Sequence, residues 1–245
     1  MKKIIVPFFL ICGLSLFSCK DDDNVGELRK VPKSITSAHS NMSFGYNTKN
    51  QLIKVVDKDS ESEYSETILS YDDKGRLTKF VNAFYEPNNV TTETYSVSYI
   101  SDTQLRVADE DNEYVLVNLN DKGQAVSFNT LDGITSFSYD TRGNLVKIMD
   151  EFTTITASYD NGKGIFNSVG IANWVLLLND FDLQFFAVNN PVSVTTVEND
   201  NGSTYTRSQT FTYPSEHIIA GYPTRMSVNY TENGSTSNEV FSIIY

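Results

Sequence analysis

A seven-residue pattern that recurs along the chain constrains its fold more than any other feature. It reads Tyr-Asp-x-x-Gly-x-Leu from Tyr71 and again from Tyr139, with weaker copies from residues 46, 99, 119 and 159. Asp favours the first position of a type I turn, and Gly favours the last, where φ is positive. Each copy therefore predicts a hairpin turn with a bulge. The residues that carry the two best turns are Asp72, Gly75, Asp140 and Gly143.

The spacing of these copies indicates a sheet built from hairpins. Successive copies begin 20 to 28 residues apart, and about twenty residues suffice for two ordinary strands and two turns. Between the copies, apolar residues alternate with Ser and Thr, as over residues 92–99, 134–139 and 153–159. Such alternation is typical of an antiparallel sheet with one buried face and one face in water.

A second set of turns, such as Asn233-Gly234, falls between the Tyr-Asp turns. The two sets therefore belong at opposite rims of a meander, in which the strand-like runs number about fourteen. A sheet with that many strands usually curls or closes. We expect an all-β fold, a long antiparallel up-and-down meander curled into an open or closed barrel-like sheet.

Residues 167–188 interrupt the repeat and predict a short helical insertion. The segment has few β-branched residues, offers Asn167 or Ser168 as a helix cap, and ends before Pro191. Its apolar residues lie nearly all round a helix, which indicates burial on most sides. We expect one or two helices that plug the curled sheet. The alternative is a lid or pocket around Trp174, the only tryptophan of the chain.

The N-terminus has the features of a secretory signal. Lys2 and Lys3 precede an apolar run over residues 4–17, which is too short to span a bilayer comfortably. The run ends at Cys19, with Leu16 three residues earlier. This segment resembles the lipoprotein box of bacteria, although Phe17 stands where a small residue is usual. The resemblance implies that Cys19 is lipidated and becomes the new N-terminus. The alternative is an ordinary secretory peptide with an incidental cysteine.

A charged run, Lys20-Asp21-Asp22-Asp23, follows Cys19 directly. It resembles the export signal of Bacteroidota surface lipoproteins, which implies a lipid-anchored protein of the outer membrane that faces the cell exterior. The other interpretation is a solvated charge run at a disordered start. We therefore divide the chain into a signal peptide (1–18), a lipidated Cys with a flexible acidic tether (19–34) and a single β-repeat domain (35–245). The residues of the expected export signal are Lys20, Asp21, Asp22 and Asp23.

The repeat itself also resembles known proteins. The copy from Tyr71 to Leu77 resembles the YD repeats of Rhs and teneurin shells, in which such hairpins wind into a hollow β structure. Over residues 35–245 the arrangement is similar to a Bacteroidota surface lipoprotein family of unknown function with a porin-like β fold. The motif residues meet the requirements of a turn, so the resemblance implies an architecture and no chemistry.

No residue constellation in the sequence indicates catalysis. His39 and His217 stand far apart without a partner at metal-ligand spacing, and no nucleophile elbow, phosphate-binding loop or cofactor fingerprint is present. Acid pairs at residues 57 and 59 and at residues 109 and 111 lack the ligand pattern of a calcium loop. We expect no catalytic, cofactor-binding or metal-binding residues, no cofactor and no enzymatic activity.

The negative charge of the chain limits the classes of partner that it can bind. Its 31 acidic residues outnumber 19 basic ones, for a net charge of −12, and this excess opposes binding to nucleic acid. We expect attachment to the membrane through the lipid at Cys19. The expected function is binding or scaffolding, with a glycan, another nutrient polymer or an envelope protein as partner. The alternatives are a glycosidase-like hydrolase with a carboxylate pair at one rim and a structural or adhesive envelope component.

Overall fold

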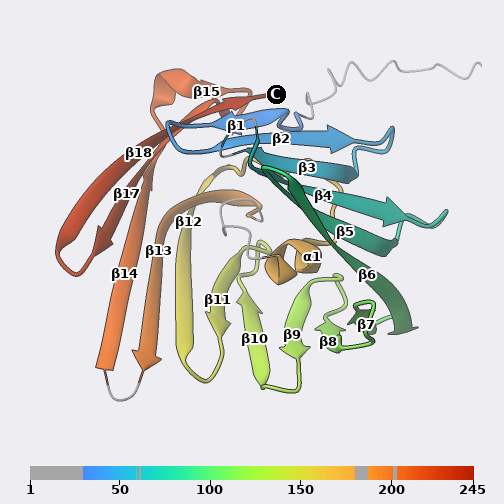
Figure 1. Cartoon of the computed structure of the whole chain (residues 1–245). Helices are drawn as coiled ribbons and strands as arrows, with labels where there is room; N and C mark the ends of the chain where they lie inside the picture. Colours follow the sequence, from blue (N-terminus) through green and yellow to red (C-terminus); the bar gives the residue numbers. More distant parts are fainter. Residues whose placement is uncertain (1–29, 59, 61, 180–186, 201–202) are drawn as a thin grey trace, which may run out of the picture.

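The computed structural model describes residues 30–245, except residues 59, 61, 180–186 and 201–202. Within this part, sixteen strands form one closed antiparallel barrel (Figure 1). The expected all-β meander is therefore confirmed, the sheet closes, and it has more strands than the fourteen or so that the sequence indicated. Cys19 and the acidic residues that follow it lie outside the described residues.

The barrel strands follow the chain order with one exception. Two short strands, β15 (Ile218–Ile219) and β16 (Tyr222–Pro223), form a separate sheet, so β14 pairs directly with β17. The barrel strands are β1 (Ser34–Thr36), β2 (Asn41–Tyr46), β3 (Leu52–Lys58), β4 (Tyr64–Tyr71), β5 (Leu77–Glu86), β6 (Asn89–Ser101), β7 (Gln104–Ala108), β8 (Tyr114–Leu119), β9 (Ala125–Asn129), β10 (Ile134–Tyr139), β11 (Leu145–Met149), β12 (Thr153–Lys163), β13 (Asn189–Asp200), β14 (Ser203–Thr212), β17 (Arg225–Glu232) and β18 (Ser235–Ile244).

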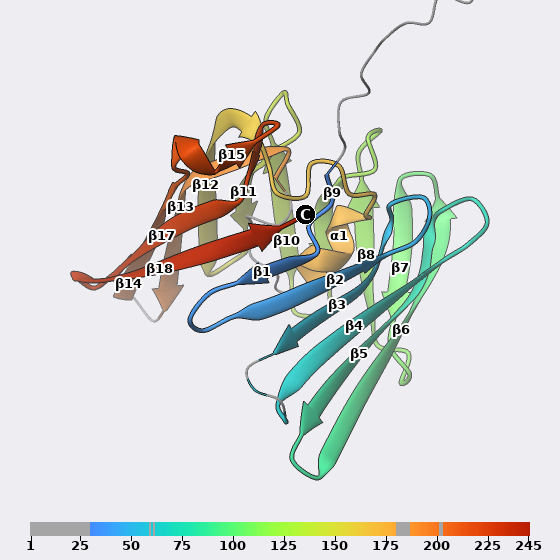
Figure 2. The same ribbon diagram turned by 90° about the horizontal axis from the view of Figure 1, so that it is seen from above.

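The first and last strands close the barrel. The three residues of β1 pair with β18 on one side and with β2 on the other, with Ile35 opposite both Ile243 and Met42. Figure 2 shows β1 between these neighbours beside the C-terminus. The first strand begins at Ser34, one residue before the boundary drawn from the sequence. Contacts reach still further back, since the backbone N–H of Lys33 donates to the carbonyl of Ile244.

Over its C-terminal strands the outer wall of the barrel is mainly polar, with Val240 and Ile244 also exposed there, and part of the inner wall is buried and apolar. On β18, Phe241 and Ile243 are buried and Ser242 between them is exposed. Membrane-spanning barrels have the reverse arrangement, with an apolar band facing outward. This part of the wall is therefore suited to contact with water. Its outward-facing hydroxyl and amide residues include Ser193, Thr195, Thr206, Ser208, Thr210, Asn229, Thr231, Thr236 and Asn238.

The expected Tyr-Asp turns have the backbone conformation that their sequence favours. Gly75 and Gly143 have φ of 79° and 97°, a region that costs other residues strain. The N–H of Gly75 donates to the carbonyl of Asp72, and Asp72 Oδ1 accepts the N–H of Arg76. The register shifts between Ser70 and Tyr71, as expected for a bulge.

The copy from residue 159 was wrongly expected to form a hairpin. Its strand, β12, instead continues to Lys163, and the chain then passes into the insertion. Residue 162 is the glycine of this copy, but Gly164 comes so close to the carbonyl of Ala187 that a Cβ there would lie 2.1 Å from the oxygen. In place of a hairpin turn, the chain at Gly164 therefore packs against the backbone at Ala187, where the insertion ends.

The helix of the insertion is shorter than expected. Within the described residues it covers only α1 (Asn173–Leu178), and its N-cap is Ala172. Asn167 does not cap a helix, because its side chain donates to the carbonyl of Val188. Residues 180–186 of the expected insertion lie outside the described residues. No helix of the described part is long and apolar enough to cross a membrane.

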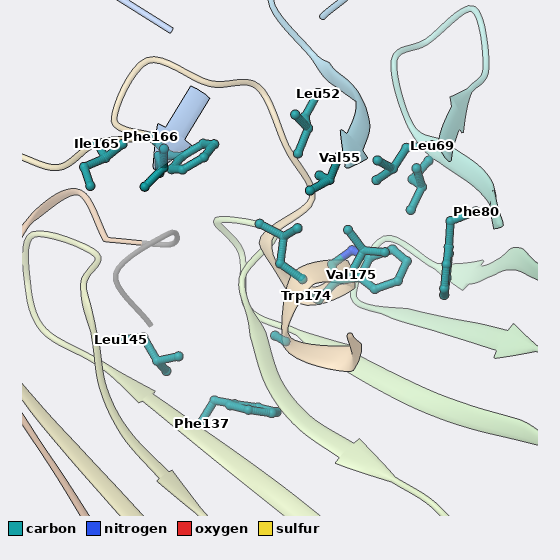
Figure 3. Close-up of a cluster of buried hydrophobic side chains, with 14 of the residues drawn as sticks. Leu52, Val55, Leu69, Phe80, Phe137, Leu145, Ile165, Phe166, Trp174 and Val175 are labelled. Carbon is teal, nitrogen blue, oxygen red and sulfur yellow. The ribbon is translucent and has the colours of Figure 1, made fainter. Parts of the chain in front are cut away.

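The helix packs inside the barrel (Figure 1). Trp174, Val175 and Leu176 are at most 3% exposed and belong to the core. The helix is therefore the expected plug. Burial of each of these side chains stabilises the fold by on the order of 2 kcal/mol. The wall residues drawn around Trp174 and Val175 are Leu52, Val55, Leu69, Phe80, Phe137 and Leu145 (Figure 3).

Candidate functional site

The two rims of the barrel have different structures. At the rim of the Tyr-Asp turns, which we call the repeat rim, three repeat tyrosines bond to neighbouring backbone, whereas the hydroxyl of Tyr139 is buried without a hydrogen-bond partner among the described residues. Tyr71 donates to the carbonyl of Leu52 over 2.7 Å, and Tyr159 donates to that of Leu145 over 2.6 Å. Burial raises the pKa of both phenols. Tyr46 donates in the same way to Pro32, so the chain enters the barrel at the repeat rim.

The opposite rim, which we call the open rim, contains a cavity of about 620 Å³. The cavity lies between the inner faces of β5 to β8, the β9–β10 turn and the C-terminal end of α1. We call it the mouth pocket. Its lining combines four carboxylates, four aromatic rings and two amides. These residues are Glu93, Asp109, Glu113, Asp132, Phe80, Phe84, Tyr95, Tyr114, Asn82 and Asn179.

A chain of hydrogen bonds holds the floor of the mouth pocket. Thr67 donates from Oγ1 to Oδ1 of Asn82 over 3.0 Å, and Asn82 donates from Nδ2 to Oδ1 of Asn179 over 2.6 Å. Asn179, the C-cap of α1, donates in turn to the carbonyl of Val175. Asn82 is only 8% exposed. The plug helix and the wall are therefore joined at the base of the pocket.

Aromatic rings form one side of the pocket. Phe80 and Tyr95 are stacked, with ring centroids 4.7 Å apart and planes 13° apart. Tyr95 donates to Oε2 of Glu93 over 3.0 Å. Burial, followed by this bond and the charges of Glu93 and Asp109, raises the pKa of Tyr95 to about 12. Phe84 leaves 44% of its surface exposed, so a ligand can reach its ring, whereas Tyr114 alternates with the inward-facing Val115 and turns its ring towards Arg106 on the outer face.

The charge of the pocket is negative. Four carboxylates line it, and among the described residues of its lining there is no lysine or arginine. Arg106 lies nearby, with its guanidinium 4.5 Å from the centroid of the Tyr114 ring. Its Nη2 donates to the carbonyl of Asn112. The guanidinium of Arg106 therefore contacts the Tyr114 ring and the Asn112 carbonyl.

The residues singled out in the sequence do not form this pocket. Asp72, Gly75, Asp140 and Gly143 lie in turns of the repeat rim. His39 lies between β1 and β2, and His217 in a short 3₁₀ helix after β14. Of the acid pairs considered for calcium, only Asp109 lines the pocket. No group of three or more His, Cys, Asp or Glu that could hold a metal ion occurs in the described part of the chain.

Sequence reasoning missed the mouth pocket, although one signal for it was present. Glu93 and Tyr95 alternate along β6 with outward-facing Thr94, and Asp109 and Glu113 flank an open-rim turn. Acids on the apolar face of a strand are unusual. This signal gives no position around the barrel, so it could not show that these side chains surround one cavity.

Comparison with known proteins gives a distant likeness. A porin-like protein from Bacteroides uniformis matches 87% of this chain and 97% of its own, at 15% identity and a TM-score of 0.41. A porin-like protein from Bacteroides vulgatus matches 88% of this chain and 99% of its own, at 10% identity and a TM-score of 0.40. No protein-family model matches the chain. No curated protein matches it.

Proposed function

We propose that this chain is a lipid-anchored binding protein of the outer membrane, which faces the cell exterior and captures a glycan in the mouth pocket. The observation that carries the proposal is the mouth pocket itself, in which an exposed ring and hydrogen-bonding groups converge on one cavity. Cavities of this size with a few converging polar groups are the usual form of small-ligand sites. Another nutrient polymer, or an envelope protein, is the alternative partner.

The placement of the pocket suits capture from outside the cell. The chain enters at the repeat rim, where Tyr46 bonds Pro32, and the mouth pocket opens at the other end of the barrel. A lipid on Cys19 would therefore hold the repeat rim towards the membrane and leave the pocket facing away from it. The mainly polar outer wall supports a barrel that stands in water and is attached by its lipid.

Binding is a better assignment than hydrolysis because two of the acids have structural partners. Oδ1 of Asp109 accepts the backbone N–H of Glu113 over 2.9 Å. Glu93 accepts the phenol of Tyr95. Both carboxylates thereby hold the shape of the pocket. The exposed ring of Phe84 can stack on the C–H face of a sugar, and the carboxylates can accept hydrogen bonds from its hydroxyls.

A glycan array followed by calorimetry tests this proposal. The mature protein should bind at least one oligosaccharide, and Phe84→Ala should weaken that binding at least about tenfold. Tyr205→Ala is the matched control, because Tyr205 lies on β14 and is 49% exposed. No oligosaccharide bound at millimolar concentration, or equal losses in the two variants, would contradict the proposal.

A further inference from the structure

We propose that the mouth pocket prefers glycans with free amino groups, so that a sugar ammonium binds there more tightly than the neutral or N-acetylated sugar. This inference rests on the proposed function and names the substrate class of the same cavity. It depends on three properties of the cavity together: its charge, its aromatic rings and the way its amides are already used.

The charge of the cavity favours a cation. Its carboxylates lie on three segments of the wall, with Glu93 on β6, Asp109 and Glu113 around the β7–β8 turn, and Asp132 in the β9–β10 turn. Arg106 contacts the Tyr114 ring and the Asn112 carbonyl. In a partly enclosed site, uncompensated carboxylates attract a cation more strongly than they would in open water.

The plug helix adds to this negative potential. The last turn of α1 ends at Leu178 and Asn179, and both residues line the cavity. The C-terminal end of a helix carries partial negative charge on its unpaired carbonyls. The first turn of α1 has no acidic residue and its last turn no basic one. Asn179 already donates to the carbonyls of Val175 and Leu176, so this end of the helix adds only weakly to the negative charge of the wall.

The rings explain why the ligand should be a sugar as well as a cation. Phe84 is 44% exposed and lines the cavity, where it lies on the same wall as the stacked pair Phe80 and Tyr95. The face of an aromatic ring attracts an ammonium group and also packs against apolar C–H groups. An amino sugar presents both features within one ring.

The amides of the floor are occupied by each other. Asn82 donates to Asn179, accepts from Thr67, and is buried. The carbonyl of an N-acetyl group needs a hydrogen-bond donor, and these amides already donate to Asn179 and Val175, whereas an ammonium needs acceptors, which the carboxylates supply. The hydrogen-bonding capacity of the cavity therefore favours the amine over its acetylated form.

Three tetrasaccharides with the same β-1,4-linked gluco backbone provide the test. They differ only at C2, which carries an ammonium in the chitosan tetramer, an N-acetyl group in the chitin tetramer and a hydroxyl in cellotetraose. At about pH 5.5, where exposed carboxylates are charged, calorimetry with the mature protein should give at least about tenfold tighter binding for the chitosan tetramer. Raising the salt concentration should reduce this preference.

Variants separate the charge from the rest of the site. Glu113→Gln should weaken binding of the chitosan tetramer about tenfold and leave cellotetraose binding unchanged. Asp121→Asn is the matched control, because it removes the same charge from an exposed turn of the repeat rim, and it should have no effect on either sugar.

The outcomes distinguish this inference from the proposed function. Equal affinities for the three sugars, or an unchanged preference in Glu113→Gln, would overturn the inference and leave glycan capture standing. If none of the three binds but another array glycan binds through Phe84, the inference is again overturned and the proposed function is retained. If no glycan of any kind binds, both are wrong.

Discussion

The side-chain amide of Gln51 donates a hydrogen bond to the carbonyl oxygen of Gly75 over 2.9 Å. Gln124 makes the same contact with Gly143 over 3.0 Å. In both cases the glutamine belongs to one copy of the repeat and the glycine to the next. These bonds connect neighbouring hairpin turns, which the hydrogen bonds between strands do not reach. The repeat therefore specifies both the individual turns and the links between them.

Removing one of these links should lower stability by a moderate amount. Gln51→Ala should reduce the free energy of unfolding by about 1 kcal/mol, because the carbonyl of Gly75 loses its partner. Lys49→Ala, in the same turn and exposed, should have little effect. Urea melts of the mature protein measure both changes. Equal midpoints would show that the link does not contribute to stability.

The turn glycines should be more sensitive than their neighbours. Gly143→Val should cost at least about 1 kcal/mol, because a β-branched residue is disfavoured at positive φ. A Cβ at Gly143 would also lie 3.3 Å from Nε2 of Gln124, whereas Gly123 has nothing within 4 Å. Gly123→Val should therefore cost less, and Thr141→Ala almost nothing. Denaturant midpoints that are equal for Gly143→Val and Thr141→Ala would contradict this account of the repeat.

The plug helix should be the most sensitive part of the core. Trp174 is 2% exposed, and Trp174→Ala should reduce the free energy of unfolding by about 3 to 5 kcal/mol through the cavity it leaves. Chemical denaturation followed by circular dichroism measures this, since the variant has no tryptophan fluorescence. A loss below about 1 kcal/mol would show that the packing of Trp174 contributes little to the stability of the barrel.

Stability should fall in alkali before the folded tyrosines ionise. The pKa of Tyr95 is raised from 10.0 to about 12, so above pH 10 the unfolded chain loses this proton and the folded protein keeps it. The free energy of unfolding should therefore be unaffected by this group below about pH 10 and decrease from there to about pH 12. Tyr95→Phe should make the decrease shallower in urea melts across this range. The same slope in the variant and the parent would exclude this contribution.

Membrane attachment should depend on a single cysteine. Cys19→Ala should leave a protein that is soluble or uncleaved, because the acyl chains supply the membrane affinity. Detergent-phase partitioning measures this, and retention of the cleaved variant in the detergent phase would contradict it. Replacing residues 21–23 with Ala should keep the anchor but remove exposure at the cell surface, as judged by protease accessibility on intact cells.

The sequence by itself determined the features that depend on a few neighbouring residues. Asp72 and Gly75 specify a turn because a carboxylate and a residue free to adopt positive φ satisfy that backbone locally. Alternation along strands such as β10 specifies one apolar face and one polar face. Repetition of these two elements is sufficient to predict an antiparallel meander, and its length is sufficient to predict a curled sheet.

The tertiary structure alone decided the closure of the barrel and the position of the mouth pocket. Closure depends on the pairing of Ile35 with Ile243, which are about 200 residues apart, and no local pattern specifies a partner at that distance. The pocket brings together Glu93 of β6, Asp109 after β7 and Leu178 at the end of α1. Only the closed wall and the packed plug place these side chains around one cavity, because alternation gives the face of a residue and not its position around the barrel.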